Sequence, residues 1–230
     1  MNNVFSRPNL ERIITAKDRE RKTIITPSYL RLEKSIEGSF TTVSFDVLAN
    51  QGNPTVTERR LAITDKFVVT SLGFFILKST ATAASVPVST AAQLASAVPY
   101  TYPNADAFSL SGQATALQAL YNSYLSLRVD TTVYVDSLSM MHFQRIGTSQ
   151  QVTAAANQNG IGRDEWNSAA FGGVAIEPTI TLNGGSKIDL FINLPTSIAL
   201  GGSASHAYQT TACLFAYGYL KANASNLNGN

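Results

Sequence analysis

The chain is short of the residues on which most enzyme active sites are built. Its 230 residues include one cysteine, Cys213, and two histidines, His142 and His206. A lone cysteine excludes a disulfide framework and a cysteine-based zinc site, and in its apolar surroundings we expect a buried small hydrophobic residue. The string GGSAS at 201–205 lacks the closing glycine of the serine elbow Gly-x-Ser-x-Gly. We therefore predict that the protein is not an enzyme.

Motifs that bind a cofactor or a metal ion are also missing. Gly160 and Gly162 lack the third glycine of a dinucleotide-binding fingerprint and follow no predicted strand. Asp164 and Glu165 are adjacent acids without further oxygen ligands, which is weak evidence for a cation site. We expect no cofactor and no metal.

Charge is scarce as well, since only 14 % of the residues are charged. A freely diffusing monomer usually carries more charge to stay soluble. Two interpretations remain equally open: the surface is covered by neighbouring subunits, or the chain is simply rich in Ser, Thr and Asn.

The basic residues are concentrated at the N-terminus. Residues 1–26 hold six basic and three acidic side chains, a net charge of +3. Within this basic arm, Leu10, Ile13 and Ile14 have helical spacing and predict a short amphipathic helix, which needs a surface to pack on. No apolar signal sequence follows Met1, and no stretch reaches the ~20 apolar residues that span a bilayer.

What the chain has in abundance is alternation of apolar and polar residues, the period of a half-buried strand. We predict one domain of about eight to ten strands over 27–222, a short helix over 113–122, and a disordered tail over 223–230. Residues 79–112 and 147–173 are predicted to be long loops. The main predicted strands cover 28–36, 40–48, 60–78 (central, with a kink at Gly73), 125–135 (divided at Asp130-Thr131), 139–146 and 210–222.

The stretch EPTITLNGGSKIDLFINLP, residues 177–195, raises the question of whether its glycines cradle a phosphate. A phosphate loop needs a helix after the glycines, and here an alternating strand follows. Asn-Gly between two alternating runs is typical of a tight turn. We predict a β-hairpin.

About eight strands separated by some long loops fit a jelly roll, in which two four-stranded sheets pack as Greek keys. An immunoglobulin-like sandwich is the alternative. It would be shorter, at about 100 residues, and its core tryptophan lies on a strand, whereas Trp166 falls in a predicted loop.

The stretches RLAITDKFVVTSLGFFILK (60–78) and EPTITLNGGSKIDLFINLP (177–195) resemble the strands of viral jelly-roll capsid proteins, especially bacteriophage virion proteins. The basic arm, the low charge and the single cysteine fit the same resemblance. It is architectural, covers 27–222 and assigns no functional residue. It implies a structural protein of a virion, synthesised in the host cytoplasm, that assembles with copies of itself and other virion proteins. Double-barrel capsid proteins need about twice the predicted number of strands.

Both long loops are expected at subunit contacts, because ordering loops of this length costs entropy that burial against a partner offsets. Aromatic residues dominate interface energetics and are the preferred anchors. The arm is expected to dock on a neighbouring subunit; weak contact with nucleic acid comes second, and membrane contact is not expected. The interface candidates are Leu10, Ile13, Ile14, Arg19, Arg21, Tyr100, Tyr102, Trp166 and Phe171.

A competing function is a carbohydrate- or receptor-binding β-sandwich, such as a fibre or spike domain. Such a protein exposes a cluster of aromatic side chains beside polar residues. Tyr100, Tyr102, Trp166 and Phe171 are the candidates for that cluster as well.

Overall fold

A computed structural model describes most of the predicted domain. The residues it describes are 14, 18, 23–80, 91–103, 108, 112–144, 173–200 and 208–222. The arm helix, the 147–173 loop and the 223–230 tail fall outside these residues, apart from Ile14, Asp18, Gly173 and the segment from Thr23 onward. Those predictions are therefore not tested.

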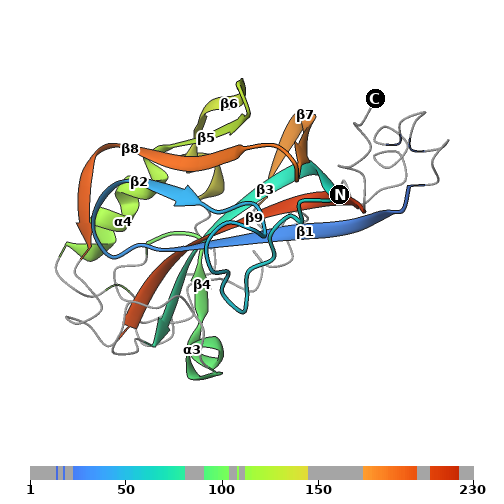
Figure 1. Ribbon diagram of the computed structural model, residues 1–230. Coiled ribbons are helices and arrows are strands. Elements are labelled where there is room, and N and C mark those ends of the chain that lie inside the picture. The colour runs from blue at the N-terminus through green and yellow to red at the C-terminus, as the bar shows by residue number, and fades with distance from the viewer. Residues whose placement is uncertain are drawn as a thin grey trace.

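Within the described residues, nine strands form two antiparallel sheets packed face to face (Figure 1). The first sheet contains β1 (Ile25–Ser35), β9 (Tyr208–Lys221), β3 (Lys66–Thr80), β4 (Val98–Tyr100) and β7 (Val174–Asn183). The second contains β2 (Gly38–Phe45), β8 (Ile188–Leu200), β5 (Tyr124–Val129) and β6 (Thr132–Ser139). The helices are α3 (Ala91–Ser96), α4 (Gln113–Tyr121) and the short 3-10 helix η1 (Met140–Phe143). The prediction of an all-β sandwich is confirmed.

The strand order makes β3 the centre of the first sheet. The order is β1-β9-β3, and the far edge of β3 is shared by β7, along Lys66–Leu72, and β4, along Ile76–Lys78. From Phe67 to Leu77 the side chains of β3 are mostly buried on both faces, as the apolar sequence of this stretch predicts for a central strand. The second sheet has the order β2-β8-β5-β6.

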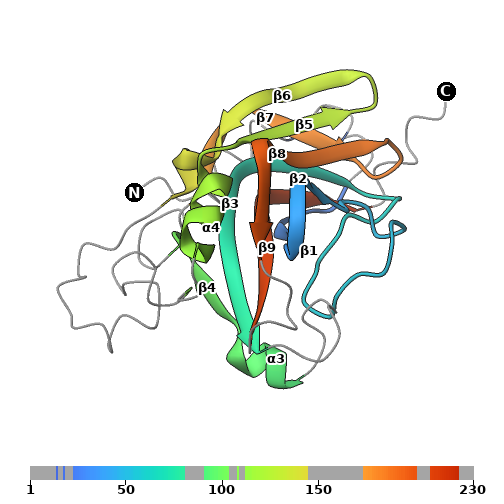
Figure 2. The ribbon, with the colours of Figure 1, turned by 90° about the vertical axis from the view of Figure 1, so that its left-hand side faces the viewer.

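The core lies between the two sheets and is closed at one end by α4 (Figure 2). Phe74 of the first sheet and Leu125 and Ile192 of the second are at most 1 % exposed. From α4, which confirms the helix predicted over 113–122, Tyr121 packs edge-on against Phe74 with ring centroids 5.6 Å apart.

The hairpin predicted over 177–195 is wrong, although its two strands and its turn are present. β7 pairs with β3 in the first sheet, whereas β8 pairs with β2 and β5 in the second. The turn at Asn183–Ser186, closed by the Ser186 amide on the Asn183 carbonyl at 3.0 Å, therefore carries the chain from one sheet to the other. Alternation reports that each strand has one buried face, and it carries no information about the pairing partner.

Gly184 has a packing role in this turn. A Cβ at Gly184 would lie 2.0 Å from the carbonyl oxygen of Ala62, so only glycine permits this approach of two backbones. The Gly184 amide also donates to the Asp65 carbonyl at 2.9 Å. The glycine binds the turn to the segment that leads into β3.

Three further predictions differ from the structure in whole or in part. The division at Asp130-Thr131 is confirmed, but the turn breaks the alternation, so Val133 is 54 % exposed while Val129 is buried. The strand predicted over 139–146 is wrong, because β6 ends at Ser139 and a 3-10 helix follows. The loop predicted over 79–112 contains α3 and β4, which its small residues and prolines concealed.

Candidate subunit interface

The outer face of the first sheet carries a row of aromatic and arginine side chains. In the register of β1 with β9, Tyr29 lies opposite Tyr217 and Arg31 lies opposite Phe215. Opposed residues share a face of the sheet, and the intervening Leu30 belongs to the core. These four side chains therefore point away from the core. Together with Arg59, they are called the aromatic face below.

The rings of the aromatic face pack against one another. Phe215 and Tyr217 are stacked, with centroids 5.7 Å apart and planes 8° apart, and Tyr29 lies 6.0 Å from Phe215. Phe75 of β3 meets Phe215 edge-on at 5.7 Å. Such pairs contribute about 0.5–1.5 kcal/mol each beyond the area they bury. The row is thus held in a defined arrangement.

Two guanidinium groups lie over these rings. Arg31 is 5.6 Å from the Phe215 centroid, and Arg59 is 5.4 Å from the Tyr29 centroid. Arg31 also pairs with Glu33 at 2.6 Å, whereas Arg59 has no carboxylate partner among the described residues. Tyr29 is 40 % exposed and Arg59 is exposed, so this end of the face reaches solvent. Tyrosine, phenylalanine and arginine are the residues enriched at protein–protein interfaces.

Residues 46–61, called the strap, bring Arg59 to the face. Arg59 and Arg31 exchange two backbone hydrogen bonds of 2.9 Å, so the strap pairs with the outer edge of β1. The Glu58 carboxylate accepts from the amides of Glu33 at 3.0 Å and Thr55 at 2.8 Å. In return, the Thr57 hydroxyl donates to the Glu33 carboxylate at 2.8 Å. The strap and β1 thus each supply a carboxylate that accepts a hydrogen bond from the other, which holds the strap against β1.

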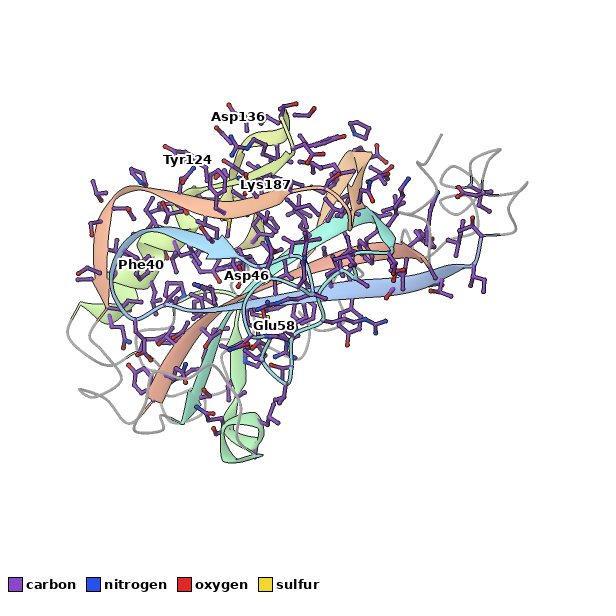
Figure 3. All side chains as sticks on the ribbon, in the orientation of Figure 1. Phe40, Asp46, Glu58, Tyr124, Asp136 and Lys187 are labelled. Atoms are coloured by element: carbon purple, nitrogen blue, oxygen red, sulfur yellow. The ribbon has the colours of Figure 1, made fainter. Side chains whose placement is uncertain are left out.

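A buried ion pair also holds the strap in place. Arg60 pairs with Glu58 at 2.8 Å, and the two side chains are 5 % and 1 % exposed. Arg60 also donates to the Gln51 carbonyl and lies 3.6 Å from Asp46. Figure 3 labels Asp46 and Glu58 on the strap, close to β1. Buried charges need such partners, because desolvation without them is costly.

Burial governs the titratable groups of this face. It raises the pKa of the Cys213 thiol, which confirms the prediction of a buried small hydrophobic residue and makes the side chain a poor nucleophile. Burial also raises the pKa of Tyr217 to about 12, with smaller contributions from Cys213 and Tyr29 and an opposing one from Arg31. Near neutral pH the phenol of Tyr217 and the thiol of Cys213 are uncharged, and the arginines give the face its positive charge.

Of the predicted interface residues, the structure describes Ile14, Tyr100 and Tyr102, and none of the three is among the residues of the aromatic face. Tyr100 is 2 % exposed in the core, where it packs edge-on against Phe108 at 5.1 Å, and Tyr102 is half-buried. Ile14 is half-buried as well. The roles proposed for these residues at an interface stay predictions. The remaining candidates lie outside the described residues: Leu10, Ile13, Arg19, Arg21, Trp166 and Phe171.

Sequence reasoning missed the aromatic face, although a signal existed. Tyr29 and Arg31 are two residues apart, as are Phe215 and Tyr217, so each pair lies on one face of its strand. What the spacing does not reveal is that β1 and β9 are neighbours in register.

Asp18 is the one charged arm residue that the structure describes. Its carboxylate pairs with Lys221 at the end of β9 at 2.6 Å, and the two side chains are 12 % and 7 % exposed. The Thr23 amide donates to the Asp18 carbonyl at 3.0 Å. This part of the arm therefore contacts its own domain.

No group of three or more potential metal-ligating side chains occurs in the described part of the chain. Among the helices described, none has the length and apolar content that crossing a membrane requires. Comparison with family models, curated proteins and solved structures finds no match for this chain.

Proposed function

We propose that the chain is a jelly-roll subunit that assembles with copies of itself as a structural protein of a virion. The observation that carries the proposal is the nesting of strand pairs. With β4 set aside, the eight remaining strands pair from the two ends of the chain inward: β1 with β9, β2 with β8, β3 with β7, and β5 with β6.

This nesting is what a long antiparallel ribbon produces when it is wound into two sheets. The two innermost pairs then fall in different sheets, as β3–β7 and β5–β6 do here. Jelly rolls have eight strands in two sheets, and viral capsid proteins are among the proteins built on them. Because folds host many functions, the fold alone does not carry the assignment.

The aromatic face adds the second support. Rings held in place by strand pairing lose little entropy on binding, and arginine above a ring offers both apolar contact and directed hydrogen bonds. A rigid patch of this composition suits a repeated contact between identical subunits, as a shell requires. The low overall charge favours the same function, since covered surfaces need little charge. On this proposal the protein works in the virion after synthesis in the host cytoplasm.

A carbohydrate- or receptor-binding domain is the second candidate, favoured by the exposed Tyr29–Arg59 pair. An aromatic ring beside a hydrogen-bond donor fork is the arrangement expected of such a site. On this alternative the pair binds a glycan or a receptor rather than another copy.

The experiment that separates the two candidates measures mass by light scattering across a range of protein concentrations. The proposal predicts a mass that rises with concentration in the wild type and falls towards the monomer in the Tyr29→Ala/Arg59→Ala double variant. Glu177→Ala, an exposed change on β7, serves as the control and should assemble normally. A wild type that stays monomeric at every concentration but binds glycans through Tyr29 would replace the shell function with the alternative.

A further inference from the structure

The hairpin formed by β5 and β6 exposes apolar side chains on the second sheet. Val133 and Tyr134 of β6 are 54 % and 50 % exposed, although both residue types favour burial. Together with the exposed Asp136, these residues of β6 are called the hairpin surface below. Figure 1 places β6 at the outer margin of the second sheet, where no described strand pairs with its free edge. The hairpin surface is therefore open to a partner.

Asp136 supplies this surface with an unpaired negative charge. Its backbone carbonyl accepts from the Ser126 hydroxyl, but its exposed carboxylate has no ion-pair partner among the described residues. Asp189, on the neighbouring β8, differs in pairing with Arg128 at 2.7 Å and Lys187 at 3.2 Å. Asp136 is thus available for a cation supplied from outside.

The shape of β6 limits how a partner binds. Its pairing with β5 shifts register twice, between Leu125 and Leu127 and between Leu127 and Arg128. Bulges of this kind twist an edge strand and discourage continuation of the sheet by another strand. Recognition therefore has to use the side chains of the hairpin rather than a backbone ladder.

The aromatic face has the complementary chemistry. It presents Tyr29 and the unpaired cation of Arg59, whereas the hairpin presents apolar side chains and the unpaired anion of Asp136. The two surfaces lie on opposite sheets, and Figure 3 places Asp136 and Glu58, the neighbour of Arg59, far apart. One copy cannot join its own two surfaces, so any contact between them is made between copies.

We propose that the hairpin surface of one copy docks on the aromatic face of the next, with Asp136 paired to Arg59. The inference rests on the proposed function, since it names the contact through which copies assemble. Two different surfaces make the contact heterologous, and such contacts repeat from copy to copy, as a closed ring where the rotation between copies closes and as an open assembly where it does not. Charge pairing at its rim sets register and partner choice.

Exchange of the two charges tests the pairing on the full chain. The variants Asp136→Arg and Arg59→Asp are each expected to weaken association at least about tenfold, because each places like charges opposite one another. Combining both substitutions in one chain restores opposite charges at every contact and should restore assembly. Glu177→Arg on β7 makes the same charge change at another exposed site and should assemble as the wild type does.

Sedimentation velocity gives the association constants, and circular dichroism checks that each variant is folded. Normal assembly by both single variants would overturn the inference and leave the proposed function standing. Weakened single variants with no recovery in the double variant would also overturn it. A wild type that never associates would overturn both proposals.

Discussion

The outer strands β1 and β6 each leave one edge of a sheet without a neighbouring strand, but the chain treats the two edges differently. The edge of β1 is covered by the strap, through the paired backbones of Arg31 and Arg59 and the buried carboxylates of Glu33 and Glu58. The edge of β6 has no such cover in the described part of the chain, and Val133 and Tyr134 beside it are half exposed. One edge is closed by the chain itself, and the other is the edge at which we propose that the next copy binds.

The difference separates stability from association. At β1, buried charges hold one another in place, so that removing one leaves another without a partner. At β6, side chains that already face water lose little when they are replaced. We therefore expect substitutions of the buried charges at β1 and the strap to change folding, and substitutions of the exposed residues of β6 to change assembly.

The largest effect on stability is expected from Glu58→Ala. This change leaves the buried Arg60 guanidinium without its 2.8 Å partner and two amides without an acceptor, at a cost of about 3–5 kcal/mol in the free energy of unfolding. Urea denaturation measures it. Asp136→Ala at the other edge should stay within about 0.5 kcal/mol of the wild type. Equal losses of stability in Glu58→Ala and Asp136→Ala would contradict the difference between the two edges.

A smaller effect is expected from Thr57→Val, which keeps the shape of the side chain but deletes the hydroxyl that donates to Glu33 at 2.8 Å. Leaving a buried carboxylate short of one donor costs about 1–3 kcal/mol. Thr132→Val on β6 is the matched control, since Thr132 is exposed and the change should be nearly neutral. A neutral Thr57→Val would mean that Arg31 and Thr55 satisfy the carboxylate without Thr57.

An alkaline titration tests the burial of Tyr217, which lies on the β1 side of this comparison. The unfolded chain releases the Tyr217 proton near pH 10, whereas the folded chain retains it to about pH 12 because the ring is buried. This group's contribution to stability is therefore complete below pH 10 and is lost as pH rises from 10 to 12. Absorbance at alkaline pH should show a tyrosine transition near pH 12 that is lost in Tyr217→Phe, whereas Tyr121, whose burial also raises its pKa well above the ordinary value, should titrate late in both proteins. A transition near pH 12 of unchanged amplitude in Tyr217→Phe would assign it to another ring.

The sequence predicted burial best for strands that have one face against the core. The alternation of Ile188, Leu190 and Ile192 predicted a buried face, and all three side chains are at most 5 % exposed. Pairing was not predictable, because β7 and β8 differ in sheet although only a tight turn separates them. Local pattern fixes which side of a strand is buried, whereas the partner depends on contacts between distant segments.

The candidate site was less predictable for the same reason. Its parts come from β1, the strap and β9, and most of the strap lies between the strands predicted over 40–48 and 60–78. Glu33 and Glu58 look like solvated surface charges until the strap is placed beside β1. Aromatic content in long loops drew the prediction to Tyr100, whose ring packs in the core of the same chain.

The measurement that most directly tests the contact between copies is hydrogen–deuterium exchange on dilute and assembled wild-type protein. The account predicts that assembly slows exchange in β1, the strap and the β5–β6 hairpin, since these segments carry both sides of the contact. Amides of α4, the helix that closes one end of the core, should exchange equally in both samples. Slower exchange confined to other segments, with β1, the strap and the hairpin unchanged, would contradict the account.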